Sequence, residues 1–232
     1  MLGNIVILLL SWLLLRLEQR SLSVLGLSPS LLRLLQLVLG FLATLALAIL
    51  LRNLFAFLAS FEWVPMPGLG TGFLFEGLYN TFQSVLFEEL LFRGYLLYRL
   101  MKLAGEKKAA LLSAAAFGIY HWFTFSVWGN PALMIWVLVY TGFWGLMLAY
   151  AYTRTGSLAL PIGLHWGWNL VDQVIYNERG GSLFTALTSV HTRYLSSLES
   201  MIWLQLPPLL FAVAVIVLLS QYRLPAKFSK HS

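Results

Sequence analysis

A short charged stretch lies inside an otherwise apolar run from about residue 73 to residue 100. It contains two adjacent carboxylates, Glu88 and Glu89, followed by Arg93. Each charged side chain near the centre of a membrane helix costs roughly 2.5–3.5 kcal/mol on insertion scales. Three such groups within one and a half helical turns therefore require partners or a water-filled pocket, which other segments of the chain must provide.

The composition indicates that this stretch belongs to a membrane protein. Of the 232 residues, 59% are hydrophobic and only 10% are charged, whereas soluble domains carry about 25% charged residues. Several runs approach the roughly 20 apolar residues that cross a bilayer as a helix. We therefore predict an all-α, polytopic transmembrane bundle with no soluble module.

The apolar runs predict about seven transmembrane spans, over residues 2–17, 34–58, 72–98, 108–127, 132–153, 157–176 and 202–221. Most lysine and arginine residues fall in alternate loops and in the C-terminal tail. The positive-inside rule places those loops in the cytosol, with the N-terminus outside and the C-terminus cytosolic. Because the basic residues lie between apolar runs, the net charge of +6 does not predict a nucleic-acid partner.

Helical spacing separates the two carboxylates. Residues four apart share a helix face, so Glu89 and Arg93 are expected to form an ion pair, while Glu88 points in another direction. A polar stripe also precedes Glu88 at four-residue steps, through Glu76, Asn80 and Ser84. Such a stripe is expected to face protein or water rather than lipid.

Two further predicted spans carry polar groups at a similar depth. His121 lies in the fourth span, and His165 and Asn169 share a face of the sixth. With a rise of about 1.5 Å per residue, these groups and Glu88 lie very roughly 12–20 Å from the cytosolic ends of their helices. A lone membrane histidine often serves only to join two helices, but four polar groups at one depth predict a common site.

One carboxylate and two imidazoles can activate water in two ways. Glu88 can act as a general base while histidine and asparagine side chains stabilise an oxyanion. Alternatively, zinc can be held by Glu88, His121 and His165 and activate a bound water. Both routes give amide hydrolysis, and the lack of cysteine excludes a thiol nucleophile. We expect Glu89, clamped by Arg93, to support Glu88.

Three motifs in this order resemble those of the CAAX-protease and bacteriocin-processing (CPBP, or Abi) family. They are Glu88-Glu89-x-x-x-Arg93, Phe117-x-x-x-His121 and His165-x-x-x-Asn169. The best-known eukaryotic member is the type II CAAX prenyl endopeptidase. The resemblance covers about residues 72–176 and implies an intramembrane endopeptidase. By the same resemblance, the water-activating base is Glu88, the groups that complete the site are His121, His165 and Asn169, and the supporting pair is Glu89 with Arg93.

The resemblance also implies a substrate class. The substrate is a membrane-associated peptide, including a prenylated CAAX-type peptide, or a hydrophobic peptide, and the other partner is membrane lipid. Because a short chain rich in leucine and tryptophan is typical of a bacterial protein, the expected location is a bacterial plasma membrane or another internal membrane. Two alternatives remain open: a non-catalytic bacteriocin-immunity or scaffold protein on the same fold, and a proton-coupled transporter suggested by the polar stripe before Glu88.

The chain is predicted to have three parts. Residues 1–71 form two accessory helices, residues 72–176 form the catalytic core, and residues 177–232 form an outer segment, a last span and a basic cytosolic tail. A loop rich in proline and glycine, from Glu62 to Gly72, separates the first two parts. Apolar residues at helical spacing over 182–200 predict an amphipathic helix that lies flat at the outer interface.

Overall fold

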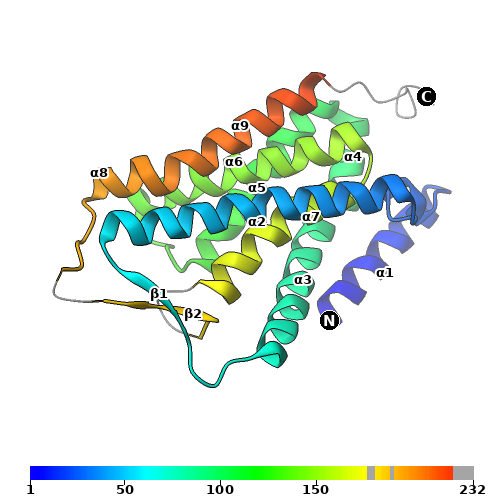
Figure 1. The fold of residues 1–232 in the computed structure, drawn as a ribbon. Coiled ribbons are helices and arrows are strands. Elements are labelled where there is room, and N and C mark those ends of the chain that lie inside the picture. The colour runs from blue at the N-terminus through cyan, green and yellow to red at the C-terminus, as the bar shows by residue number, and fades with distance from the viewer. Residues whose placement is uncertain (177–180, 189–190, 222–232) are drawn as a thin grey trace.

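The structure is a computed structural model that describes residues 1–176, 181–188 and 191–221. It is a bundle of helices with one small sheet at its side (Figure 1). The helices are α1 (Leu2–Leu17), α2 (Leu31–Ala59), α3 (Thr71–Arg93), α4 (Tyr95–Ala104), α5 (Glu106–Thr124), α6 (Pro131–Thr155), α7 (Ala159–Leu170), α8 (Ser197–Ser200) and α9 (Leu206–Gln221). The prediction of a mainly helical chain is confirmed.

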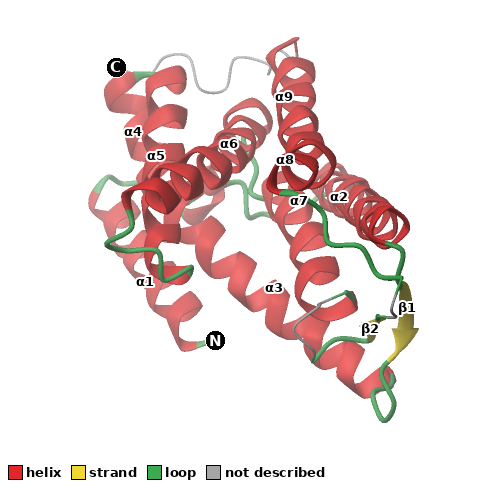
Figure 2. Cartoon of the chain, turned by 90° about the vertical axis from the view of Figure 1, so that its left-hand side faces the viewer, coloured by secondary structure: helices red, strands yellow, loops and turns green. Residues whose placement is uncertain are grey.

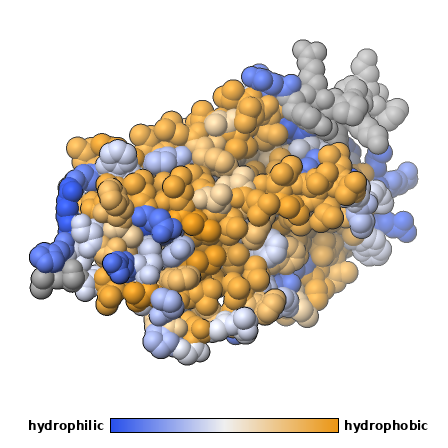
Figure 3. All heavy atoms as spheres, viewed as in Figure 1, coloured by the Kyte–Doolittle hydropathy of each residue, from blue (hydrophilic) through white to orange (hydrophobic). Residues whose placement is uncertain are grey.

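The outer surface of the bundle is apolar. Among the described residues, the helices long and apolar enough to cross a membrane are Leu31–Ala59, Pro131–Thr155 and Ser197–Gln221, and α1 is a shorter apolar helix. Apolar residues cover most of the face shown in Figure 3, and polar residues gather toward its two ends. Since so large an apolar surface marks contact with lipid, the chain is an integral membrane protein.

The charged stretch lies on α3, which crosses the long helices α2, α6 and α9 steeply (Figures 1 and 2). The predicted span over residues 72–98 is not one continuous helix, because α3 ends at Arg93 and α4 begins at Tyr95. A Cβ on the intervening Gly94 would lie only 2.2 Å from the carbonyl oxygen of Leu90. The bend therefore requires glycine, and it places Glu88 in the last turns of α3.

Two buried apolar clusters hold the helices around α3 and α6. In the first, Val85 and Leu90 of α3 pack with residues of α1, α4 and α6. In the second, Met147 and Leu148 of α6 pack with Leu164 of α7 and with residues of α9. Together they fix the positions of α3, α6 and α7, the helices on which most of the predicted polar groups lie.

Local signals explain the bounds of α6. The side chain of Asn130 accepts a hydrogen bond from the backbone N–H of Leu133 at 3.2 Å, and Pro131 occupies the first turn. Both arrangements favour a helix N-terminus. At the other end, Gly156 has a φ of 61°, a left-handed conformation that glycine adopts without steric cost.

The sheet corrects one prediction. Strand β1 (Glu62–Pro65) pairs antiparallel with β2 (Phe184–Leu187), with Glu62 opposite Leu187 and Pro65 opposite Phe184. The amphipathic helix predicted over 182–200 is therefore wrong, since its first part is a strand and only α8 at its end is helical. Residues 189–190 of that segment, and the basic tail over 222–232, lie outside the described residues.

Helix α2 packs directly behind α7. A Cβ on Gly163 would lie 2.2 Å from the carbonyl oxygen of Leu37, and a Cβ on Gly167 would lie 2.2 Å from that of Phe41. Glycine lets two membrane helices approach this closely because no side chain separates their backbones. The segment predicted as accessory thus supports the helix that carries His165, while the three-part division of the chain stays a prediction.

We expect Gly167→Ala to destabilise the protein and to reduce any activity that depends on α7. The added methyl group overlaps backbone atoms of α2, and overpacking of this kind costs about 1–3 kcal/mol. The matched control is Gly142→Ala in α6, whose Cβ would make only an ordinary contact of 3.7 Å with Ala114. Thermal unfolding in detergent should show a lower midpoint for the first variant and not for the second. Equal midpoints would contradict the close approach.

Candidate active site

A buried ion pair forms the base of the site. Arg93 Nη1 lies 3.0 Å from Glu89 Oε1, and both side chains are 0% exposed. The same arginine donates from Nη2 to the carbonyl oxygen of Gly145 at 3.1 Å, and its guanidinium carbon lies 4.2 Å from the centre of the Phe117 ring. Arg93 therefore ties α3 to α5 and α6, and the pair predicted from four-residue spacing is present.

Glu89 also orients His165 of α7. Its Oε1 atom lies 2.8 Å from His165 Nδ1, and a carboxylate that already accepts from Arg93 can only accept from the histidine as well. We therefore place a hydrogen on Nδ1, which donates to Glu89. The other ring nitrogen, Nε2, then faces the second carboxylate.

Glu88 is buried beside His165 but does not pair closely with it. Its Oε2 atom lies 3.9 Å from His165 Nε2, a separation too long for a hydrogen bond. Among the residues that the structure describes, this buried oxygen has no hydrogen-bond partner. A buried carboxylate oxygen without a donor is costly and requires an explanation. Glu89 Oε2 is also buried without a partner, but the Glu89 carboxylate is held by Arg93 and His165 through Oε1, whereas no hydrogen bond holds Glu88 among the described residues.

His121 lies near these groups at the end of α5. Its Nδ1 atom donates to the carbonyl oxygen of Phe117 in the same helix at 2.8 Å, which leaves Nε2 to face other partners. The Phe117 ring lies 4.5 Å from the His121 ring and 5.9 Å from the His165 ring, measured between centres. Phe117 thus places His121 on the same side of the bundle as His165.

Asn169 follows His165 by one turn on the same face of α7 and is half-buried. Within the described part of the chain, no hydrogen bond joins its amide to the other candidate residues. The orientation of α7 is set instead by Trp166, whose Nε1 donates to Thr81 of α3 at 3.1 Å. The structure therefore joins Arg93, Glu89 and His165 by hydrogen bonds and places Glu88, His121 and Asn169 beside them.

The polar stripe on α3 rises from the surface to the site. Glu76, Asn80 and Ser84 are exposed, whereas Glu88 at its end is buried. The sequence did not predict the contact with the Gly145 carbonyl, because a backbone acceptor leaves no sign in the residue pattern, or the hydrogen bond between Glu89 and His165, which joins two distant helices. Phe117 was visible only as part of the motif around His121.

The three candidate zinc ligands are Glu88, His121 and His165. Over residues 1–176, 181–188 and 191–221, no three His, Asp or Glu side chains converge closely enough to hold a metal ion. The donor set of Glu88, His121 and His165 thus does not form a tetrahedral metal site in this arrangement.

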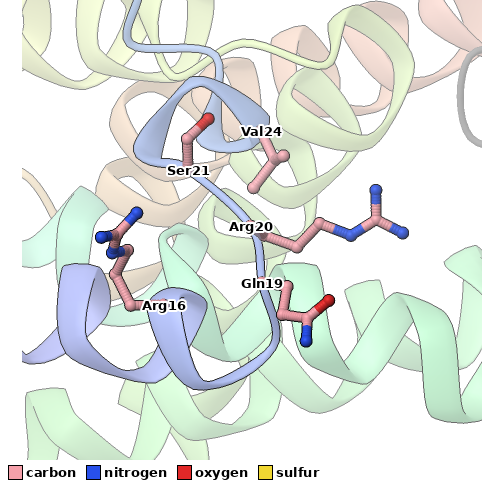
Figure 4. Close-up of a pocket in the computed structure, with 5 residues that line it drawn as sticks. All are labelled: Arg16, Gln19, Arg20, Ser21 and Val24. Atoms are coloured by element: carbon pink, nitrogen blue, oxygen red, sulfur yellow. The ribbon is translucent and has the colours of Figure 1, made fainter.

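A pocket at the end of α1 is separate from this network (Figure 4). It has a volume of about 630 Å³ and is lined by Arg16, Gln19, Arg20, Ser21 and Val24. The arginine side chains in Figure 4 point away from each other rather than toward a common point. This pocket therefore contains none of the predicted site residues.

We expect Glu89→Gln to reduce catalysis at least about 100-fold, within the range of effects on proton transfer by a positioned side chain. The neutral amide cannot hold both the Arg93 guanidinium and His165 Nδ1–H with the strength of a carboxylate. The control is Glu76→Gln, an exposed glutamate on the same helix. Steady-state cleavage rates of both variants check this, and wild-type activity in Glu89→Gln would contradict a supporting role.

Comparison with known proteins adds an independent finding. A family model described as type II CAAX prenyl endopeptidase Rce1-like matches residues 70–171. No curated protein and no solved structure matches the chain. The matched segment runs from the start of α3 to the end of α7 and contains all three motifs. Through this core, 102 of its 232 residues, the chain is similar to the type II CAAX prenyl endopeptidase Rce1-like family.

Proposed function

We propose that the protein is an intramembrane endopeptidase in which Glu88 activates the attacking water. The observation that carries the proposal is the buried Glu88 Oε2, which has no hydrogen-bond partner among the described residues and faces His165 Nε2 at 3.9 Å. Similarity to a protease family supports hydrolysis of a peptide bond. The substrate is a membrane-associated peptide, including a prenylated CAAX-type peptide, or a hydrophobic peptide.

The reaction begins when the Glu88 carboxylate takes a proton from water. The water oxygen attacks the carbonyl carbon of the peptide bond, and the negative charge moves to the carbonyl oxygen. The amide of Asn169 can donate to that oxyanion without changing its protonation state, and a donor at this point contributes several kcal/mol. Glu88 then returns the proton to the leaving amine nitrogen as the carbon–nitrogen bond breaks.

The supporting groups keep the reactive pair in place during this cycle. Arg93 neutralises Glu89, and Glu89 holds the His165 ring so that Nε2 faces Glu88. His121, with Nδ1 bound to a backbone carbonyl, presents Nε2 as a further polar contact. No step uses a metal ion, since the candidate ligands do not converge on one point.

The finer topology is also part of the proposal. We infer seven membrane passages, with the N-terminus outside, the C-terminus cytosolic and the core of residues 72–176 as the catalytic part. The basic residues on alternate loops support this orientation. A plasma membrane, as in a bacterium, is the proposed location.

Cleavage assays with purified protein in detergent test the proposal. The peptide panel contains prenylated CAAX peptides and hydrophobic leader peptides, with products identified by mass spectrometry. We expect the wild type to cleave one class, and His165→Ala to lose that cleavage while keeping its thermal midpoint. If His165→Ala cleaved the peptide at the wild-type rate, the assignment of His165 to the active site would be wrong.

The two alternatives give different results in parallel experiments. A scaffold or immunity protein would show no cleavage of any peptide, and its cellular phenotype would survive Glu88→Ala. A proton-coupled transporter would move protons across liposomes through the exposed stripe of α3. We expect neither outcome, because the carboxylates of Glu88 and Glu89, His165 and Arg93 are buried together, whereas the rest of the polar stripe on α3 is exposed.

A further inference from the structure

A cavity of about 270 Å³ lies between the long helices on the side of the site where α7 ends. Its walls come from α2, α6, α7, the residue after α5 and two short turns. The lining residues are Ala48, Leu51, Arg52, Phe125, Trp136, Tyr140, Trp168, Asp172, Leu204 and Gln205. Four of them are aromatic, so the cavity offers mainly apolar surface.

The cavity adjoins the candidate active site along α7. Asp172 follows His165 by seven residues, which is two helical turns and roughly 10 Å along the same face. Trp168 lies next to Asn169 in the chain, and the Phe125 ring lies 5.2 Å from the His121 ring between centres. A peptide placed at Glu88 and His165 can therefore reach the cavity with a neighbouring side chain.

Two π-helical turns border this cavity. The first, η2 (Val171–Ile175), continues α7 and supplies Asp172, and the second, η3 (Met201–Gln205), precedes α9 and supplies Leu204 and Gln205. π-helical turns are rare in proteins and occur frequently at functional sites. Both turns contribute to the wall of this cavity, which places two irregular helical segments at one site.

An ion pair fixes one wall of the cavity. Arg52 of α2 pairs with Asp172 of η2, and the Trp63 side chain of β1 donates to the carbonyl oxygen of Arg52 at 3.0 Å. The pair joins the helix behind α7 to the turn that follows it. Since each charge already has a partner, the cavity has no unmatched charge to attract an ionic ligand, and its aromatic surface decides what binds.

We propose that this cavity is the subsite for one bulky apolar side chain of the peptide, next to the bond that is cleaved. The proposal rests on the endopeptidase function proposed above. The volume lies just below the roughly 300–1,000 Å³ of pockets that enclose whole drug-sized ligands, so it fits a single leucine, phenylalanine or tryptophan side chain. Aromatic walls favour such a side chain through edge and stacking contacts.

The test uses a hydrophobic peptide cleaved by the wild type, in which the residues flanking the mapped bond are changed in turn to Gly, Ala, Leu, Phe and Trp. The variant Ala48→Phe fills the cavity from α2. We expect it to lower kcat/KM for the peptides with Leu, Phe or Trp at one position by roughly 10–200-fold, as for other mismatches in apolar pockets. The Gly and Ala peptides should be cleaved as by the wild type.

The matched control is Leu50→Phe, two residues away on α2 and 64% exposed, which should change no preference. A second variant, Trp136→Ala, enlarges the cavity and should shift preference from Leu toward Trp. Equal losses for every peptide in Ala48→Phe, or unchanged preferences in both cavity variants at wild-type thermal midpoints, would overturn the subsite. A wild type that cleaves no peptide in the panel would overturn the endopeptidase function itself, and the subsite with it.

Discussion

Glu88→Gln is expected to lower peptide cleavage by about 10²–10⁴-fold or more, the range measured for general bases. Glutamine has nearly the same shape as glutamate but cannot take a proton from water. Because Glu88 Oε2 makes no hydrogen bond within the described residues, the substitution removes no contact that holds the fold. Thermal unfolding should therefore stay close to that of the wild type while the cleavage rate falls.

The comparison needs a glutamate that differs only in its position. Glu76 lies three turns earlier on α3 and is exposed, so Glu76→Gln removes a charge without touching the site. We expect this control to retain wild-type cleavage. If Glu88→Gln cleaved at the wild-type rate with the same bond mapped, Glu88 would not be the base, and water would have to be activated elsewhere.

The second large effect concerns stability. Arg93→Met should destabilise the protein by about 3–5 kcal/mol, because it leaves the Glu89 carboxylate buried without its cation. It also removes the hydrogen bond to the Gly145 carbonyl and the contact with the Phe117 ring. Equilibrium or thermal unfolding in detergent measures the loss.

A surface arginine provides the matched control. Arg99 lies 3.6 Å from Glu18 and its side chain is 44% exposed, so Arg99→Met should cost at most about 1 kcal/mol. Changing both buried partners, in Glu89→Leu with Arg93→Met, should recover part of the stability because no lone charge remains. It should not recover cleavage, since His165 loses its partner. Equal stability of Arg93→Met and Arg99→Met would contradict the buried pair.

The contacts within one helix could be predicted from the sequence. Four-residue spacing predicted the Glu89–Arg93 pair, and the structure shows it at 3.0 Å. The three motifs also indicated that His165 and His121 gather near Glu88. The first prediction succeeded because helix geometry fixes neighbours along the chain, while the common site of His121, His165 and Glu88 stays a prediction.

Contacts between distant segments could not be predicted in the same way. The pairing of β1 with β2 joins residues more than a hundred positions apart. The local apolar spacing over 182–200 contains no sign of this partner and predicts a helix instead. The hydropathy of a segment also does not fix the tilt of its helix, so it did not indicate that α3 crosses the long helices steeply. In the sequence, the bend is marked only by Gly94, and a single glycine inside an apolar run is weak evidence of a helix bend.

The close packing of α2 behind α7 also joins distant segments and could not be predicted. The sequence shows Gly163 and Gly167, but it does not show that α2 is the helix that packs against them. Small residues four apart on a membrane helix predict a close neighbour without naming it. The support that α2 gives to the His165 helix is therefore known from the structure alone.

The measurement that tests the central claim most directly is cleavage in water enriched in ¹⁸O, with a metal chelator present. Direct attack by water activated at Glu88 predicts that the new carboxyl group of the product gains one solvent oxygen, at a rate that the chelator does not change. Since every peptide hydrolysis gives labelled product over many turnovers, the label is followed over a single turnover with enzyme in excess. Product without the label in that turnover would show an oxygen transferred from an enzyme carboxylate and would contradict direct attack by water. Loss of cleavage with the chelator, restored by added zinc, would contradict a glutamate-activated mechanism.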